Sequence, residues 1–176
     1  MRSVVQRTTL HDGPLFSVER LTVRDDAGAE HHRDVVRHPG AVVILPILDD
    51  EHIILIRNER VAVGENLWEL PAGTREPDEP TIETARRELV EETGYRAEAI
   101  EPMGPLYTTP GFCDERIELF LATGLAHVGQ NLEAGEQIEV HPTPLTDVLQ
   151  MIDDGRLHDA KSVAAVLLWR HRADRR

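Results

Sequence analysis

The sequence has a single cysteine and no long hydrophobic run. Its single cysteine, Cys113, excludes an intrachain disulfide framework and indicates a reducing environment such as the cytoplasm. No segment reaches the roughly 20 consecutive apolar residues of a transmembrane helix, and the N-terminus has no apolar signal segment. The sequence therefore predicts a cytoplasmic protein with no membrane partner.

Basic residues are also scarce, because 19 Lys and Arg face 32 Asp and Glu and the formal net charge is -13. A surface that binds duplex nucleic acid needs Lys and Arg to neutralise phosphates, so we expect no nucleic-acid partner. An acidic protein needs cations to receive a phosphate compound, and clustered carboxylates can collect Mg²⁺ for that purpose. The search for a site therefore starts with carboxylates.

The remaining composition is that of a globular protein, with 40% hydrophobic and 29% charged residues in 176. Short β-type runs between Leu15 and Arg37 are separated by an Asp-Asp-Ala-Gly turn, which predicts a β-rich arm. We divide the chain into this arm, residues 1–39, and a main domain, residues 40–176.

The main domain alternates between strand and helix patterns, so we assign the chain to the α/β class. Nearly continuous apolar runs predict buried strands, and apolar residues at helical spacing predict helices. The expected strands span residues 41–48, 52–57 and 117–126, and the expected helices span residues 81–93, 145–155 and 160–172.

The helix expected over residues 81–93 carries three carboxylates on one face. At 100° per residue, Glu88, Glu91 and Glu92 lie within an arc of roughly 100° beside the apolar face. Such a stripe either is a solvated acidic face, holds protons with raised pKa values, or binds a hard divalent cation. Arg87 lies one turn before Glu91, so the spacing predicts that it pairs with Glu91 and leaves Glu88 and Glu92 for metal.

The segment from Gly73 to Tyr95 resembles the Nudix box, whose fixed positions are Gly, Glu, Arg-Glu, an aliphatic residue, Glu-Glu and Gly. Only Tyr95 departs from the usual aliphatic at the last place. The positions that match at the family's spacing are Gly73, Glu79, Arg87, Glu88, Leu89, Glu91, Glu92 and Gly94.

This resemblance implies a Nudix-type α/β/α sandwich with a mixed sheet, to which the N-terminal β arm is added. It implies that Glu88, Glu92 and the Ala72 carbonyl bind Mg²⁺, or Mn²⁺ as a substitute. Further positions are implied to support the geometry of the box, namely Glu79, Arg87 and Glu91 for the helix and Gly73 and Gly94 for the backbone.

Outside the box, three features resemble the ADP-ribose pyrophosphatase branch of the family. An Arg-x-x-Arg before Glu-Leu-Pro-Ala-Gly implies that Arg60 contacts the diphosphate or ribose, although Asn58 and Glu59 replace the common Gln and aromatic. Pro110, 15 residues after the box, matches a characteristic proline, and Glu115 then matches a glutamate that accepts hydrogen bonds from ribose.

The third feature is the sequence LEAGEQIEV, which resembles the mobile acidic loop of the branch. Glu136 matches a metal ligand of that loop, and Glu133 and Glu136 are the candidates for a general base. The arm in this branch typically crosses to a second subunit, which implies a homodimer. From the arm, Asp34 and Arg37 are further substrate-binding candidates.

The implied reaction is attack of metal-activated water on the diphosphate of ADP-ribose, which yields AMP and ribose 5-phosphate. One alternative is a pyrophosphatase for another nucleoside diphosphate sugar such as GDP-mannose, with the same metal machinery. A second alternative is a catalytically silent sensor that binds ADP-ribose. The sensor is disfavoured because Glu88, Glu91 and Glu92 are intact and no DNA-reading domain follows.

Overall fold

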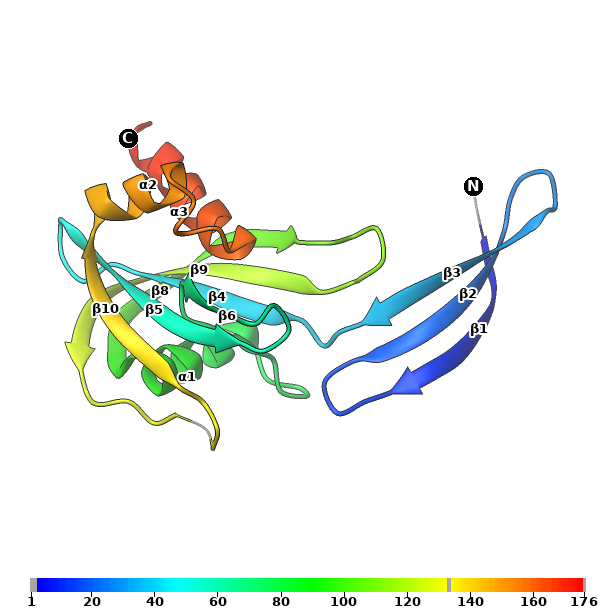
Figure 1. Ribbon diagram of the computed structural model, residues 1–176, viewed down its shortest axis with the longest axis horizontal. Helices are drawn as coiled ribbons and strands as arrows, with labels where there is room; N and C mark the ends of the chain where they lie inside the picture. Colours follow the sequence, from blue (N-terminus) through cyan, green and yellow to red (C-terminus); the bar gives the residue numbers. More distant parts are fainter. Residues whose placement is uncertain (1–2, 133, 176) are drawn as a thin grey trace.

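Residues 3–132 and 134–175, which the computed structural model describes, form three β-sheets and three helices (Figure 1). The first sheet is antiparallel, with β1, Ser3–Asp12, β2, Ser17–Arg24, and β3, Glu30–Arg37, in that order. It forms an arm that extends away from the rest of the protein, which is called the body below (Figure 1).

The body contains the other two sheets and all three helices. A mixed four-stranded sheet has the order β7, Ala72–Thr74, β4, Ala41–Pro46, β9, Arg116–His127, and β8, Tyr95–Tyr107, with β4 and β9 parallel. An antiparallel sheet has the order β10, Ile138–Pro144, β5, His52–Arg60, and β6, Glu65–Glu69. The helices are α1, Thr81–Thr93, α2, Leu145–Asp153, and α3, Ala160–Ala173.

Strand β4 lies at the centre of the body and is buried on both faces. Since side chains alternate along a strand, Val43 and Leu45 pack into one apolar cluster with residues of α2 and α3. Val42 and Ile44 point the other way and pack with α1. The expected α/β/α sandwich with a mixed sheet is therefore confirmed.

The three expected helices are present, and the limits of α1 have clear causes. The Pro80 carbonyl accepts the first backbone N–H groups of the helix, where the missing N–H of proline costs no helical hydrogen bond. Gly94 ends the helix with φ of 73°, a conformation that glycine adopts readily. A Cβ at Gly94 would also lie 2.8 Å from the backbone nitrogen of Gln130. Gly94 therefore both ends α1 and allows the later chain to pass close by.

The sequence located some strands and missed others. The apolar runs that form β4 and β5 were expected as strands, and the structure places them in different sheets, with an isolated bridge between Ile47 and Ile53. Strands β1, β6, β7, β8 and β10 were not individually expected. Strands β8 and β10 contain prolines and lie at sheet edges, where a missing N–H removes no ladder hydrogen bond.

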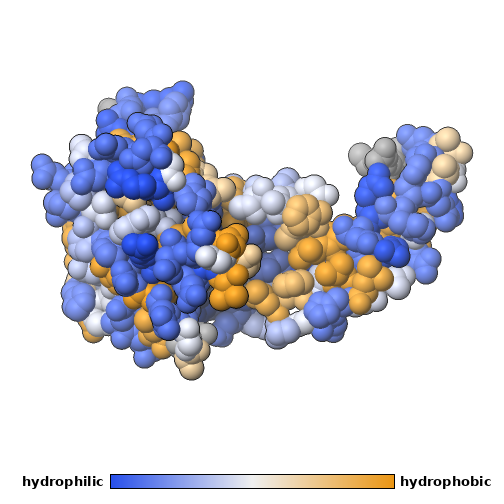
Figure 2. All heavy atoms as spheres, viewed as in Figure 1, coloured by the Kyte–Doolittle hydropathy of each residue, from blue (hydrophilic) through white to orange (hydrophobic). Residues whose placement is uncertain are grey.

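Within the described residues, neither apolar cluster of the body includes a residue of the arm strands, which are mostly exposed. Every residue of β1 is exposed, and Figure 2 shows apolar side chains on the surface of the arm where it approaches the body. The arm joins the body through β3, where Val36 N–H donates to the Phe112 carbonyl at 2.7 Å and Arg37 pairs with Asp114 at 2.8 Å. No helix among the described residues has the length and apolar character to cross a membrane.

Candidate active site

A cavity of about 650 Å³ lies between α1 and the neighbouring strand ends, a volume suited to a small-molecule ligand. Its walls come from α1, β5, the chain from β7 to Pro77, the loop before β10, and the arm. The charged residues and close backbone positions of its lining include Arg60, Ala72, Gly73, Arg75, Arg87, Glu88, Glu91, Glu92 and Glu136. Sequence reasoning from the box had selected most of these residues.

Glu88 and Glu92 are the carboxylates that lie deepest in this cavity. The Glu92 side chain accepts a hydrogen bond from Ala72 N–H at 2.8 Å, and the residue is 4% exposed. Burial raises the pKa of Glu92 to about 8 and that of Glu88 to about 7, and the charge of Glu136 adds to both shifts. Both groups are therefore costly to ionise unless a cation offsets their charge.

Arg87 forms ion pairs with three carboxylates of the box. Its Nη1 donates to Glu91 at 2.9 Å, as the helical spacing predicts, but the same nitrogen also donates to Glu88 at 2.8 Å. The expectation that Arg87 leaves Glu88 unpaired is therefore wrong, because adjacent residues on α1 can reach the same guanidinium. Glu79 accepts from the other two nitrogens at 3.2 and 3.1 Å, and these carboxylates raise the pKa of Arg87.

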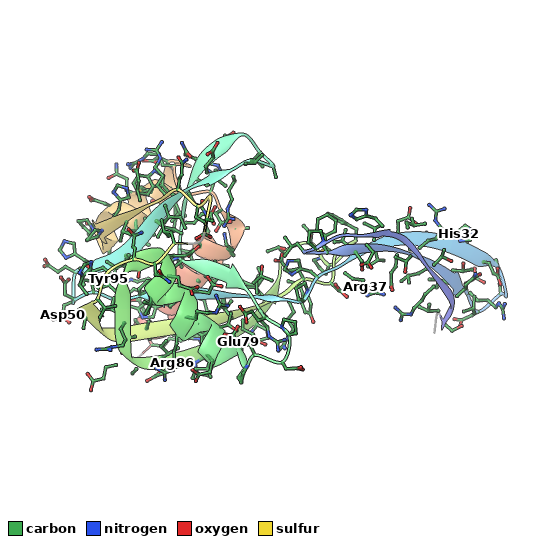
Figure 3. All side chains as sticks on the ribbon, turned by 90° about the horizontal axis from the view of Figure 1, so that it is seen from below. His32, Arg37, Asp50, Glu79, Arg86 and Tyr95 are labelled. Carbon is green, nitrogen blue, oxygen red and sulfur yellow. The ribbon has the colours of Figure 1, made fainter. Side chains whose placement is uncertain are left out.

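Glu79 also fixes the loop before α1, because it accepts a hydrogen bond from the Thr84 hydroxyl at 2.8 Å. In Figure 3, Glu79 lies at the end of α1 that faces the arm. Gly73 allows the close approach of strand and helix, since a Cβ at this position would overlap the Glu88 carboxylate. The loop, β7 and α1 thus hold one another in place around the carboxylates.

The donor set of the cavity fits a hard divalent cation. Carboxylate and carbonyl oxygens are the ligands that Mg²⁺ prefers, and this ion usually keeps several waters. In residues 3–132 and 134–175, three or more His, Cys, Asp or Glu side chains do not converge closely enough to complete a metal site. A cation held by Glu88 and Glu92 would therefore take its other coordinating oxygens from the Ala72 carbonyl, from water and from a bound small molecule.

Two more of the predicted residues border the same cavity. Arg60 lies at its wall and forms a bidentate pair with Glu69, with both distances 2.7 Å. Glu136 lies on the loop before β10 and also lines the cavity. Glu133, the other candidate base, lies outside the described residues. The cavity thus combines carboxylates with the guanidinium of Arg60 in one lining.

Three predicted substrate-binding residues do not line this cavity. Glu115 lies 3.7 Å from His38 and accepts from Thr108 at 3.4 Å. Arg37 lies where the arm meets the body (Figure 3) and lines a separate cavity of about 330 Å³. Asp34 pairs with Arg20 on the arm, with both oxygens at 2.8 Å. Within one chain, these residues remain apart from the carboxylates of α1.

Sequence reasoning missed Arg75, the pairing of Arg60 with Glu69, and the contact of Glu69 with Lys161. Arg75 lines the cavity, and among the described residues its buried Nε has no hydrogen-bond partner. Its position two residues after Gly73 was the only available signal. Glu69 was noted as part of a motif without a role, and Lys161, which contacts it at 2.5 Å, was not noted at all.

Comparison with known proteins gives one family. Residues 37–166 match the family model described as NUDIX domain. The ADP-ribose pyrophosphatase of Bacillus subtilis (strain 168) is 37% identical over 172 residues, covering 94% of this chain and 93% of that protein. The GDP-mannose pyrophosphatase of Cronobacter sakazakii is 38% identical over 162 residues, covering 86% of this chain and 82% of that protein.

A solved structure described as an ADP compounds hydrolase has the same fold. Its TM-score is 0.85 at 24% sequence identity, and the match covers 97% of this chain and 92% of that one. The arrangement of sheets and helices around the cavity therefore also occurs in a known hydrolase.

Proposed function

We propose, because this chain belongs to the Nudix family, that it hydrolyses the diphosphate of ADP-ribose to AMP and ribose 5-phosphate. Hydrolases of this family generally use a divalent metal. We assign Mg²⁺ to this role, with Mn²⁺ as a substitute. The observation that carries the proposal is the single cavity that combines the buried carboxylates Glu88 and Glu92 with the cation Arg60.

In the proposed reaction, each group of the cavity has a separate task. A bound divalent cation would lower the pKa of a water and offset charge on the diphosphate. Glu88, Glu92 and the Ala72 carbonyl would hold the cation, and Arg60 would bind the diphosphate or ribose. Glu136 would complete the metal site when substrate is present and, with Glu133, is the candidate to accept the proton of the attacking water.

Glu79, Arg87 and Glu91 would act indirectly, by holding α1 against β7. Their ion pairs link α1 to the loop before it, which would fix the position of the helix that carries Glu88 and Glu92. Gly73 and Gly94 would have the same kind of role through the backbone.

We also propose that residues 1–39 form a dimerisation arm and residues 40–176 the hydrolase domain. Among the described residues, neither apolar cluster includes a residue of the arm sheet, and the exposed edges and apolar residues of this sheet favour a second copy as partner. The partner's cavity would then receive Asp34 and Arg37 from the arm, and Glu115 would bind ribose. Light scattering at assay concentration should give the mass of a homodimer, and an active monomer would contradict this arrangement.

The function is tested by chromatographic separation of products from ADP-ribose with Mg²⁺ and with chelator. We expect AMP and ribose 5-phosphate only when the metal is present. The same assay includes GDP-mannose, because a GDP-mannose pyrophosphatase is 38% identical to this chain. A higher kcat/KM for GDP-mannose would favour this second candidate, which uses the same metal ligands.

The remaining candidate is a sensor that binds ADP-ribose without cutting it. It would bind ADP-ribose in calorimetry and release no product with Mg²⁺ or Mn²⁺. We disfavour it because Glu88, Glu91 and Glu92 are all present, with Glu88 and Glu91 paired to Arg87 and Glu92 bonded to the Ala72 N–H. The single cysteine supports a reducing, cytoplasmic location for any of these activities.

A further inference from the structure

Lys161 is the only lysine of the sequence, and its ammonium group contacts the buried carboxylate of Glu69. It sits in the first turn of α3, where its side chain is 15% exposed. Its Nζ lies 2.5 Å from the Glu69 carboxylate and 2.8 Å from Asp159. A compact ammonium group with three donors can serve two carboxylates at once, which a planar guanidinium does less readily.

Glu69 connects this lysine to the cavity. Its side chain is 1% exposed, and it accepts two hydrogen bonds from Arg60 at 2.7 Å in addition to the contact with Lys161. Burial alone would raise the pKa of Glu69, but the two cations outweigh burial and lower it. Glu69 is thus an ionised buried carboxylate that needs both partners, and one of them lines the cavity.

The first turn of α3 also holds the backbone next to Glu69. Asp159 caps the helix by accepting from Ser162 N–H at 3.1 Å and from the Ser162 hydroxyl at 2.5 Å. The Ser162 Oγ in turn accepts a hydrogen bond from Leu70 N–H at 2.8 Å. The start of α3 therefore contacts both the side chain of Glu69 and the backbone of Leu70. Leu70 lies two residues before Ala72.

We propose that Lys161 is a positioning residue for substrate binding, which holds Glu69 and through it fixes the Arg60 guanidinium at the wall of the cavity. The inference rests on the proposed function, because Arg60 is assigned there to the diphosphate or ribose. Arg60 has a half-exposed side chain and a long flexible stem, so the bidentate pair with Glu69 limits its rotation. A guanidinium held in one orientation loses less entropy when it binds an anion.

The charges of this cluster explain why a second cation is needed. Arg60 and Glu69 alone form a neutral pair, which offers little net attraction to a diphosphate. Lys161 adds a positive charge behind Glu69, while the carboxylate of Asp159 also accepts hydrogen bonds from the N–H and hydroxyl of Ser162 at the start of α3. Arg60 therefore keeps a positive field toward the cavity although it is paired.

The test is a double-mutant cycle between Lys161→Met and Arg60→Ala, read as KM and kcat for ADP-ribose with saturating Mg²⁺. Lys161→Met should raise KM by about tenfold or more and change kcat by much less, because the group acts on binding through Arg60. In the Arg60→Ala background, Lys161→Met should change KM by less than about twofold. Equal effects of Lys161→Met in both backgrounds would overturn the inference.

Two further variants keep the test independent of folding. Lys161→Gln retains a donor for Glu69 without the charge, and it replaces the methionine variant if that protein does not fold. Arg156→Met is the matched control, because Arg156 lies just before α3 and pairs with Asp154 at the surface, away from Glu69. The control should leave KM unchanged.

A binding measurement separates this inference from the proposed function. Calorimetry of ADP-ribose with the metal-free protein in chelator should give a higher Kd for Lys161→Met than for the native protein. This difference should be absent when Arg60 is replaced by Ala in both proteins. If the native protein binds ADP-ribose without cutting it, the proposed hydrolysis fails while the cycle can still be measured as Kd. If the native protein hydrolyses ADP-ribose and the cycle is additive, only the role of Lys161 fails.

Discussion

The arm and the body of this protein are stabilised by different interactions. In the body, every residue of β4 is buried, and its two faces belong to two apolar clusters. In the arm, every residue of β1 is exposed, and the strands are linked by ion pairs such as Arg20 with Asp34, whose side chains are about half exposed. Exposed pairs contribute little to folding, whereas buried apolar side chains contribute much.

This difference in stabilisation corresponds to two tasks of a hydrolase, catalysis and substrate binding. Residues that need a fixed geometry, such as Glu88 and Glu92, lie in the body, beside its buried core. The arm carries predicted binding residues that lie far from them within one chain. The comparison thus predicts that changes to the cavity carboxylates of the body affect turnover strongly and that changes in the arm affect substrate affinity weakly.

The largest effect is expected for Glu92→Gln in the body. The change retains the hydrogen bond from Ala72 N–H but removes the charge that would bind metal. Turnover should fall on the order of 10²-fold or more, with an unchanged circular dichroism spectrum. Glu98→Gln on the exposed edge of β8 is the control and should be silent. Near-normal turnover of Glu92→Gln at saturating Mg²⁺ would contradict the metal assignment.

A smaller effect is expected for Glu136→Gln, at the outer wall of the cavity. Its proposed role begins only when substrate is bound, so kcat should fall by about tenfold while KM changes little. Glu139→Gln, three residues later and exposed, is the control. A silent Glu136→Gln would show that the acidic loop has been assigned to the wrong residues. Equal effects of Glu136→Gln and Glu133→Gln would leave both as candidates for the base.

Much of the body was predictable because its signals are local. The helix spacing of residues 81–93 and the apolar runs of β4, β5 and β9 required no knowledge of distant residues. Strands β8 and β10 were missed because Pro102, Pro105, Pro142 and Pro144 argue against a strand unless its edge position is known. Whether β4 and β5 share a sheet depends on long-range pairing, which periodicity does not report.

For the site as well, the sequence predicts local features and not contacts between distant residues. The box positions Glu88 and Glu92 by spacing along one helix, so the sequence was sufficient to select them. The contact between Glu69 and Lys161 joins residues 92 positions apart and depends on how α3 packs against the body. The extra bond from Arg87 to Glu88 depends on side-chain rotamers, which spacing does not determine.

The pH dependence of stability should distinguish the buried carboxylates from the exposed arm. Burial raises the pKa of Glu92 from 4.5 to about 8, so its neutral form stabilises the metal-free fold fully below about 4.5. This contribution is lost as pH rises through about 8. Between pH 6 and 9, the Tm of the metal-free native protein should fall by about 5 °C relative to Glu92→Gln.

Magnesium provides the control for that measurement. A cation binds the ionised carboxylate, so added Mg²⁺ should restore the Tm of the native protein at pH 9. Glu92→Gln should gain much less from Mg²⁺. A native Tm that tracks the variant at every pH in chelator would show that Glu92 is ionised at no cost in the folded protein.

The smallest effect is expected in the arm, for Asp34→Asn. Asp34 is predicted to contact substrate, yet both of its oxygens accept hydrogen bonds from Arg20 within the arm sheet. If Asp34 reaches the partner's cavity in the proposed dimer, its loss should raise KM by about twofold to fivefold, with kcat unchanged. Arg20→Met removes the same cross-strand pair without removing the carboxylate, and it should leave KM within about twofold of the native value. Since both variants lose the same ion pair, an effect on the arm sheet alone would raise KM equally in both. An equal rise would assign Asp34 to the stability of the arm, whereas a rise confined to Asp34→Asn would extend the substrate site from the body into the arm.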